Sequence, residues 1–519
     1  MTLFRYLFLL MVMALLTFTK VQHAYAQKYK GDVWCWGDSA GIDWTNPISP
    51  INFRCNYRGR CGTATISDSL NNLLLYAGFL RDVQSSYKKV SIRNKYHLSV
   101  ENGDTLFGEE WYHSLLFIPK PGNDSIIYFF SNIVVAGLDP YGLYYSEINS
   151  KANNDSGIVI QKNVQLSNLP AFDGLAAVRH GNGRDWWLIF KDWDPTIPYT
   201  MANTFYIYLV DENGPVLHHA QSIGGLHNSS SGHLISNAAG DKLYHCTWQG
   251  LLQYFDFDRC TGYLSNDVLI ESFHSSQPYP YYGSIALSPN ENVLYASSWT
   301  KHSALGSQDS LYQFDLTASN ILATKTPLFG MPGIKPAMGV LRKAPDNKIY
   351  LATAFENFYP YQDTSFNIYN TNLSVINYPD SLGLACDFQP FSFYLGGART
   401  YYGLPNNPDY ELGAWVGSPC DTLTVGLTPG PSEERGAWMQ AWYNHEWNMI
   451  HVNAAQLKGK KGVLRLLDIE GRIVFEKQME VLAGGYYTSE IYMNEISEGV
   501  YVVNLVTDRE TLSFKTSKF

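Results

Sequence analysis

A β-hairpin pattern recurs six times along this chain, and this repeat limits the fold more than any other feature of the sequence. Each copy has an apolar strand, a polar turn and a second apolar strand that carries an aromatic residue. The six copies read ATISDSLNNLLLYAGF, LLFIPKPGNDSIIYFF, LAAVRHGNGRDWWLIF, LISNAAGDKLYHCTW, IALSPNENVLYASSW and VLRKAPDNKIYLATA. The aromatic residue recurs about every 55 residues, at Tyr76, Tyr128, Trp187, Tyr244, Tyr295 and Tyr350. This regularity predicts that these side chains pack between repeats and do not form a site.

Two weaker strands separate successive hairpins, for example LYQFDL followed by NILATKTPLF. Each repeat therefore holds about four strands. A lone four-stranded sheet leaves both apolar faces exposed and can bury them only against neighbouring sheets. The pattern predicts an all-β fold in which four-stranded blades stand in a ring, which is the architecture of a β-propeller.

The ring must also close, because the first and last sheets would otherwise keep one face open. Strand-like segments at 32–44 and 385–397 lie outside the six hairpins. We expect these two segments to pair as one composite blade, which predicts a seven-bladed propeller over residues 27–404. The alternative is a six-bladed propeller with additional strands at its ends.

The N-terminus has the features of a secretory signal peptide over residues 1–26. Arg5 supplies a positive charge, residues 7–18 are apolar, and Ala24-Tyr25-Ala26 fits the site that a signal peptidase cleaves. The alternative is an uncleaved anchor, but the apolar run is shorter than the roughly 20 residues that span a bilayer. No later stretch is apolar enough to cross a membrane, so we expect an exported mature chain without a transmembrane span.

The charge balance argues against one class of partner. The chain has 47 Asp and Glu against 37 Lys and Arg, and its basic residues form no cluster. Nucleic acids and anionic lipid surfaces both require Lys and Arg to neutralise phosphate groups. We therefore expect no nucleic-acid partner.

The C-terminal part of the chain differs from the repeats. Residues 405–438 are rich in turn-forming residues and are interpreted as a linker. Residues 439–519 return to alternating apolar strands, with Gly471 placed where a hairpin turns. The simplest fold for this unit is a small immunoglobulin-like β-sandwich.

Two of the hairpins resemble a known class of propeller. LSPNENVLYASS and KAPDNKIYLAT are similar to the repeats of YVTN-type and lactonase-like propellers, and FDFDRCTGYLSN resembles a phrase of secreted Bacteroidetes propeller proteins. The resemblance covers about 380 residues. It implies the fold but no particular activity, because propellers host many functions.

The C-terminal unit resembles the type A sorting domain of the type IX secretion system. The resemblance lies in LDIEGRIV, in EGVYVV and in a basic end, and its matching residues are Asp468, Gly471, Arg472, Gly499, Tyr501, Lys515 and Lys518. One feature departs from that family, since Tyr443 is followed by Asn-His-Glu where a Y-P-N-P stretch is usual. The resemblance implies the type IX machinery as a partner, removal of the tail, and a mature protein that is secreted or held at the outer-membrane surface. The alternative is an ordinary immunoglobulin-like module that binds carbohydrate or packs on the propeller.

All seven cysteines lie in the exported part, where disulfides can form. The spacing suggests local bridges between Cys55 and Cys61 and between Cys246 and Cys260. Cys35 and Cys386 fall in the expected composite blade, where they are candidates for a third bridge. Paired spacing of the kind that holds zinc is absent.

The sequence contains no recognisable catalytic motif. His445-Glu446 lacks the second histidine of a zinc protease, and no nucleophile elbow or phosphate-binding loop occurs. A propeller offers another source of sites, because the loops entering the innermost strands open onto the central funnel. The polar residues at those positions are Glu109, Glu110, His113, Asp173, His227, His233, Tyr281, Tyr282 and Lys335. Such a set would suffice for acid and base chemistry or for holding a divalent cation in the channel, although no cofactor is evident.

Three functions follow as hypotheses. The first is a secreted or surface-displayed propeller that binds an extracellular ligand or partner without chemistry of its own. The second is an extracellular lactonase-like hydrolase or a lyase that uses the funnel residues. The third is a structural component of the cell envelope or an adhesive surface, in which the 37 tyrosines and 13 tryptophans supply contact area.

Overall fold

The computed structural model describes most of the chain after residue 28. The described ranges are 29–59, 61–79, 90–108, 112–134, 142–169, 172–191, 193, 201–229, 231–275, 280–298, 309–331, 336–355, 365–421, 437–444, 448–455, 457–481 and 487–518. The predicted signal peptide lies outside these ranges. Among the helices that they contain, none has the length and hydropathy of a membrane-spanning segment.

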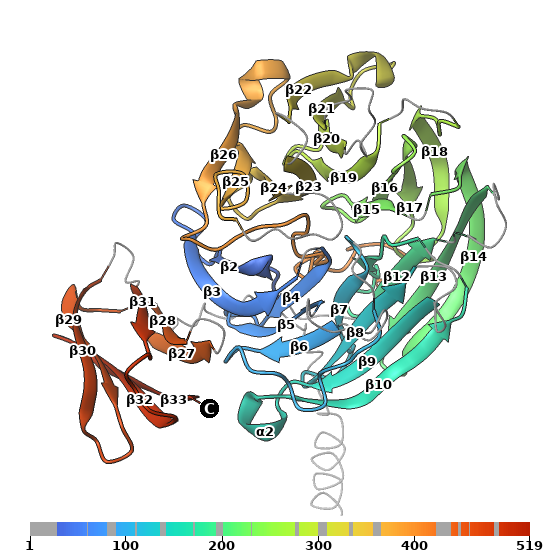
Figure 1. The fold of residues 1–519 in the computed structure, drawn as a ribbon. Coiled ribbons are helices and arrows are strands. Elements are labelled where there is room, and N and C mark those ends of the chain that lie inside the picture. Colours follow the sequence, from blue (N-terminus) through green and yellow to red (C-terminus); the bar gives the residue numbers. More distant parts are fainter. Residues whose placement is uncertain are drawn as a thin grey trace, which may run out of the picture.

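Seven antiparallel sheets follow one another along the described part of residues 33–394 and stand around a common centre (Figure 1). Two have three strands: β1 (Val33–Trp36), β2 (Asp38–Asp43) and β3 (Ile51–Arg58), then β4 (Thr63–Ser67), β5 (Leu73–Phe79) and β6 (Val90–Asn94). The next two are β7 (Leu115–Pro119), β8 (Ile126–Ile133), β9 (Gly142–Asn149) and β10 (Ile158–Ser167), then β11 (Ala176–Arg179), β12 (Trp186–Lys191), β13 (Ala202–Asp211) and β14 (Gly214–His227). A short helix, α2 (Ala152–Asp155), joins β9 to β10.

The remaining three sheets of the ring also have four strands each. They are β15 (Gly232–Ser236), β16 (Lys242–Thr247), β17 (Leu252–Phe257) and β18 (Leu264–Glu271); β19 (Tyr282–Leu287), β20 (Val293–Ser298), β21 (Ser310–Asp315) and β22 (Thr326–Gly330); and β23 (Pro336–Lys343), β24 (Ile349–Phe355), β25 (Asn372–Ile376) and β26 (Phe388–Tyr394). Short 3₁₀ turns, η1 (Leu322–Thr324) and η2 (Gly383–Cys386), precede β22 and β26. The first strands of neighbouring sheets contact one another from β1 through β4, β7, β11, β15 and β19 to β23. The predicted all-β propeller fold is confirmed.

Each of the six repeated hairpins turns through one residue in the left-handed backbone region. These residues are Asn71, Gly122, Gly183, Gly240, Glu291 and Asn347. Glycine and asparagine tolerate that conformation best, which explains the turn signals in the sequence. The exception is Glu291, whose carboxylate accepts a hydrogen bond from the backbone N–H of Ala238 at 2.6 Å.

The six repeated aromatic residues are all buried, with at most 4% of any side chain exposed. Trp187 lies in a core shared by the β11–β14 and β15–β18 sheets, and its indole N–H donates to the carbonyl of Arg259 at 2.7 Å. Tyr295 lies in the core between the next two sheets. The prediction that these residues pack between repeats is confirmed.

The expected composite blade is wrong. Residues 33–58 form a sheet of their own, and β26 is the fourth strand of the β23–β26 sheet. Gly37 adopts a φ of 64° between β1 and β2, so the N-terminal segment folds back on itself without a partner strand from the other end. The two sheets meet through side chains instead, because Tyr350 of β24 packs against Trp34 and Trp44 at centroid distances of 6.4 and 5.0 Å.

The C-terminal unit forms the predicted sandwich and stands beside the ring (Figure 1). One sheet contains β27 (Trp438–Asn444), β28 (Met449–Ala455) and β31 (Tyr487–Tyr492), and the other contains β29 (Lys461–Leu467), β30 (Ile473–Glu480), β32 (Gly499–Thr507) and β33 (Thr511–Lys518). Ile450 and Val452 of the first sheet share one buried core with Leu464 and Val503 of the second. Gly471 turns the β29–β30 hairpin with a φ of 79°.

None of the three cysteine pairs expected from the sequence is a disulfide. Cys260 and Cys420 form a disulfide, and the other five cysteines are buried and are not part of a disulfide. Cys246 is wrong as a partner for Cys260 because its thiol points inward from β16, 3.6 Å from the carbonyl of Tyr282. Cys260 lies in the β17–β18 turn, where it faces the C-terminal segment of the ring.

The other two expected bridges fail because their members lie in different cores. Cys55 packs between the first two sheets, whereas Cys61 packs against Tyr402. Cys35 shares the core of Cys55, whereas Cys386 lies between the β19–β22 and β23–β26 sheets.

Candidate functional site

The segment that follows the last sheet, residues 398–421, runs across the centre of the ring. It begins at Arg399, which exchanges backbone hydrogen bonds with Asp38 of β2. It continues beside β23, where the N–H of Val340 donates to the carbonyl of Tyr402 at 2.7 Å. We call this stretch the central segment.

Asn406 holds the middle of the central segment. Its side-chain amide lies 3.2 Å from the carbonyl oxygens of His113 and Leu115 and 3.0 Å from that of Leu175. Its backbone N–H donates to the carbonyl of Thr63 at 2.7 Å. One side chain thus joins the entrances of β7 and β11, and its backbone reaches β4.

The end of the central segment contacts the next sheets. The Tyr410 hydroxyl donates to the carbonyl of Phe117 at 3.0 Å, and the guanidinium of Arg179 donates to the carbonyl of Tyr410 at 2.8 Å. The segment then reaches the Cys260–Cys420 disulfide at the β17–β18 turn. Residues 405–421, which the sequence suggests are part of a linker, therefore belong to the ring. Their turn-rich composition reflects a path without strands, stabilised by hydrogen bonds to distant residues.

Three of the predicted funnel residues meet at the centre of the ring. The imidazoles of His113 and His233 stack face to face, with centroids 3.6 Å apart and an interplanar angle of 10°. Asp173 accepts hydrogen bonds from the backbone N–H groups of Gly232 at 3.0 Å and Tyr112 at 3.2 Å. These contacts connect the entrances of β7, β11 and β15.

The same three residues are covered by protein. His113, Asp173 and His233 are 1%, 0% and 6% exposed. Burial lowers the pKa of His113 to about 3 and that of His233 well below its ordinary value, and it raises the pKa of Asp173 to about 8 against its backbone hydrogen bonds. Both imidazoles are thus neutral at pH 7. His113 and Asp173 so placed position neighbouring strands, whereas His233 also lines the cavity described below.

His227 lies elsewhere, between the β11–β14 and β15–β18 sheets. Its Nε2 is 2.6 Å from the ammonium of Lys191, and its ring lies 5.5 Å from that of His245. All three side chains are fully buried. Burial, followed by the charge of Lys191, lowers the pKa of His227 well below its ordinary value. This cluster is separate from the stacked pair.

Tyr282 lies at another boundary between sheets. Its hydroxyl donates to Glu271 at 2.6 Å, and the same carboxylate is 2.9 Å from the ammonium of Lys325. Tyr281, which precedes it, is half-buried. The other three predicted residues, Glu109, Glu110 and Lys335, lie outside the described ranges.

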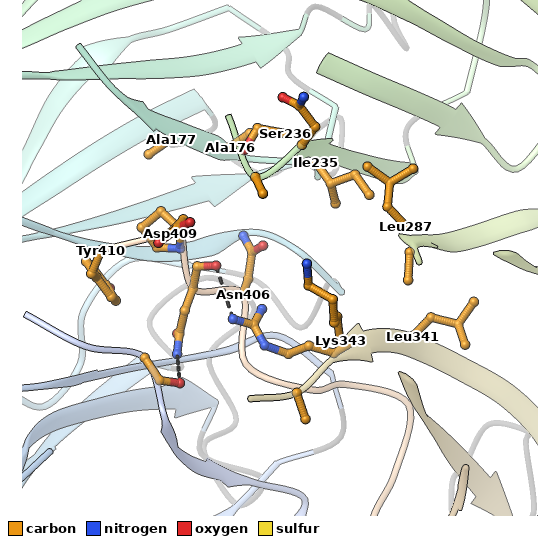
Figure 2. Close-up of a pocket in the computed structure, with 18 of the residues that line it drawn as sticks. Ala176, Ala177, Ile235, Ser236, Leu287, Leu341, Lys343, Asn406, Asp409 and Tyr410 are labelled. Atoms are coloured by element: carbon orange, nitrogen blue, oxygen red, sulfur yellow. Dashed lines mark hydrogen bonds between the residues drawn. The ribbon is translucent and has the colours of Figure 1, made fainter. Parts of the chain in front are cut away.

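A cavity of about 340 Å³ opens at the other end of the channel, where the inner strands end (Figure 2). Its apolar wall comes from β11, β15, β19 and β23, through Ala177, Ile235, Leu287 and Leu341. Residues 406–411 of the central segment form the opposite wall. Of the predicted funnel residues, His233 is the one that the lining includes.

The cavity has charged side chains of both signs at its walls. They are Asp32, Glu291, Arg342, Lys343, Asp409 and Glu411. Burial is the main cause of a lowered pKa at Arg342, to about 10, and of a raised pKa at Asp409. Sequence reasoning missed these residues, because it searched the loops that enter the inner strands. The sequence feature that could have indicated this wall is Tyr410, an aromatic residue inside a polar, turn-rich stretch.

No group of three or more His, Cys, Asp or Glu side chains in the described part of the chain is arranged to hold a metal ion. The expected divalent cation in the channel stays a prediction.

No family model and no curated protein matches this chain. Among solved structures, it is similar to the Cps50 (Swd1) β-propeller domain of Myceliophteria thermophila, with 12% identity, 64% of this chain and 94% of that one covered, and a TM-score of 0.37. It is also similar to the periplasmic gluconolactonase PpgL of Pseudomonas aeruginosa, with 11% identity, coverage of 80% and 98%, and a TM-score of 0.36. PorZ of Porphyromonas gingivalis, a bacterial surface component of the type IX secretion system, matches with 11% identity, coverage of 94% and 80%, and a TM-score of 0.27.

Proposed function

We propose that this chain is an exported β-propeller that binds an extracellular ligand or partner without catalysis of its own, and that type IX secretion delivers it to the cell surface or the medium. The proposed binding function rests on two observations: the funnel residues at the ring centre are buried, and a cavity is open at the other end of the channel. His113, Asp173 and His233 are buried against one another and against backbone, and the central segment crosses beside them. The open cavity lies at the other end and offers walls for binding.

The buried state of the funnel residues argues against the hydrolase or lyase alternative. General acid–base catalysis needs a group within hydrogen-bond reach of a bound substrate. His113 and Asp173 instead contact backbone groups, and His227 and Tyr282 contact neighbouring side chains. His233 lines the cavity, but its Nδ1 is occupied by Ser284 and by the backbone N–H of Ile285. We therefore expect no turnover of lactones or polysaccharides by the purified protein. Hydrolysis that disappears in an Asp173→Ala variant of unchanged thermal stability would support the enzyme instead.

The tail residues that match the sorting domain are of two kinds: some stabilise the sandwich, and one is exposed where a partner could contact it. This division supports a sorting role for the tail. Asp468 accepts hydrogen bonds from the backbone N–H groups of Glu470 and Arg472, and Lys518 donates to the carbonyls of Met493 and Ile496. These residues stabilise the sandwich. Lys515, by contrast, has an exposed side chain.

Export is tested by recovering the protein from medium, outer surface and periplasm and measuring intact mass and N-terminal sequence. We expect a mature chain that begins at Gln27 and lacks the C-terminal sandwich. Lys515→Ala should leave the fold intact and move protein from the surface into the periplasm, while Lys477→Ala serves as a control on another strand of the same sheet. A surface protein that retains residues 439–519 would overturn removal of the tail, and equal delivery of all variants would overturn recognition through Lys515.

A high-salt wash of the outer-membrane fraction distinguishes the proposed binding protein from a structural component of the cell envelope. A free binding protein leaves the outer-membrane fraction in high salt, whereas an envelope component stays with it.

A further inference from the structure

Two cations, Arg342 and Lys343, line the channel-end cavity, and neither has a described carboxylate oxygen within 4.0 Å, although Asp409 interacts with both at longer range. The guanidinium of Arg342 donates to the carbonyls of Pro405 and Asn407, and its Nε is buried without a hydrogen-bond partner in the described chain. The side chain of Lys343 extends from the end of β23 into the cavity (Figure 2), where its charge acts on Asp409 without a close ion pair among the described residues. A buried donor without an acceptor, such as Arg342 Nε, is costly, and a bound anion relieves that cost. Lys343 is exposed and adds a second positive charge at the same wall.

The carboxylates at the same walls already have donors. Glu291 accepts from the backbone N–H of Ala238 at 2.6 Å and from the amide of Asn237 at 3.1 Å. Asp409 accepts from two backbone N–H groups of the following turn, at 2.9 and 3.1 Å.

The two remaining carboxylates, Asp32 and Glu411, both interact with Lys30, which is not one of the two cations that line the cavity. Lys30 is 3.2 Å from Glu411 and 3.9 Å from Asp32. The donor groups left over at the walls are therefore those of Arg342 and Lys343.

We infer that the channel-end cavity binds a small organic acid, whose carboxylate lies between Lys343 and Arg342 and whose polar body contacts side-chain amides. Asn237, Asn347 and Asn406 supply such amides at the lining, and the apolar side from β15 and β19 excludes water. Arg342 stays protonated at neutral pH, because burial lowers its pKa only to about 10. The volume of about 340 Å³ falls at the lower end of ligand pockets, which run from roughly 300 to 1,000 Å³. This inference rests on the proposed binding function and names the ligand class for it.

The test compares three sugars that share one ring and differ in charge. Glucuronate carries a carboxylate, glucosamine an ammonium, and glucose neither. The purified full-length chain is titrated with each, and binding is followed by ligand-observed NMR. We expect glucuronate to bind at least about tenfold more tightly than glucose, and glucosamine not to bind, since charge-assisted hydrogen bonds are the stronger kind.

Two variants and a control assign the binding to the cavity. Lys343→Gln should weaken glucuronate binding about three- to tenfold and leave glucose unaffected, because its ammonium is exposed and partly screened. Lys348→Gln removes a lysine from the same turn that does not line the cavity, and it should bind glucuronate as the unmodified protein does. Arg342→Lys keeps the charge but loses the Nε donor, and its thermal unfolding is measured beside its affinity to separate binding from folding.

The outcomes distinguish this inference from the proposed function. Tighter binding of glucosamine, equal binding of all three sugars, or unchanged affinity in Lys343→Gln each overturns the anion site. If none of the sugars binds and the protein is still exported without turnover, the anion site fails and the proposed function stands. If glucuronate binds at Lys343 but the protein stays inside the cell, the anion site stands and the exported function fails.

Discussion

Asp38 and Arg399 form a buried ion pair that joins the first sheet of the ring to the segment leaving the last. Arg399 Nε and Nη2 lie 3.1 and 2.5 Å from the same carboxylate oxygen, and the two side chains are 5% and 3% exposed. Their backbones exchange two hydrogen bonds at 2.8 and 3.2 Å. No strand is shared between the ends of the ring, so this ion pair and its two backbone bridges supply the closure that a shared strand would otherwise give.

Replacing Arg399 by methionine should lower the free energy of unfolding of the ring by about 3–5 kcal/mol, because it leaves the Asp38 carboxylate buried without its partner. Urea unfolding followed by tryptophan fluorescence measures the change. Lys95→Met is the control, since the Lys95–Asp155 pair is partly exposed and is worth less than about 1 kcal/mol. Equal midpoints for the two variants would contradict a closing role for Arg399.

The Cys260–Cys420 disulfide should be a main source of stability for the central segment. The two cysteines are separated by 160 residues, and the chain-entropy model gives about 4–5 kcal/mol for a loop of that order. Cys420→Ser should therefore unfold at lower temperature than the unmodified protein. A reducing agent should lower the unfolding temperature of the unmodified protein and leave Cys420→Ser unchanged, because none of the other five cysteines is part of a disulfide.

The stacked histidines should make the ring acid-sensitive. An unfolded histidine takes up a proton below about pH 6.5, whereas the folded pKa of His113 is about 3. The unfolded state therefore binds more protons between these values, and stability falls as the pH drops through this window. His113→Phe keeps an aromatic ring in the stack and removes the proton that His113 takes up on unfolding. The slope of the unfolding free energy against pH should therefore decrease by up to about 1.4 kcal/mol per pH unit.

Urea unfolding between pH 4.5 and pH 8 measures that slope. A slope that is unchanged in His113→Phe would show that other groups cause the acid sensitivity.

Asn406 should contribute more to stability than an ordinary surface asparagine. Alanine at this position leaves the carbonyls of His113, Leu115 and Leu175 without their shared donor, which costs about 2–3 kcal/mol. Asn213→Ala, in the exposed β13–β14 turn, should change stability by less than about 0.5 kcal/mol. Hydrogen exchange at residues 398–421 provides the second measurement, and it should rise in Asn406→Ala alone.

The hairpin repeat was predictable because its signals are local. An aromatic residue such as Tyr350 and its turn residue Asn347 lie within one hairpin, and the pattern of each hairpin can be seen without its neighbours. The same holds for Gly471 and the tail sandwich. The position rule for propeller loops selected His113, Asp173 and His233, which the structure places together because the entrances of inner strands meet at the ring centre. It could not indicate that other parts of the chain cover them.

The alternation and spacing of apolar residues were enough to predict a ring of β-sheets followed along the chain by a sandwich, because the side chains of each strand point to alternate faces with a period of two. The course of residues 398–421 depends instead on the folded ring. Its stability comes from carbonyl groups, from Arg179 and Arg342, and from Cys260, all of them more than 50 residues away in the chain. Only the folded ring brings these groups to one axis, and the same arrangement forms the channel-end cavity with Arg342 and Lys343 at its wall.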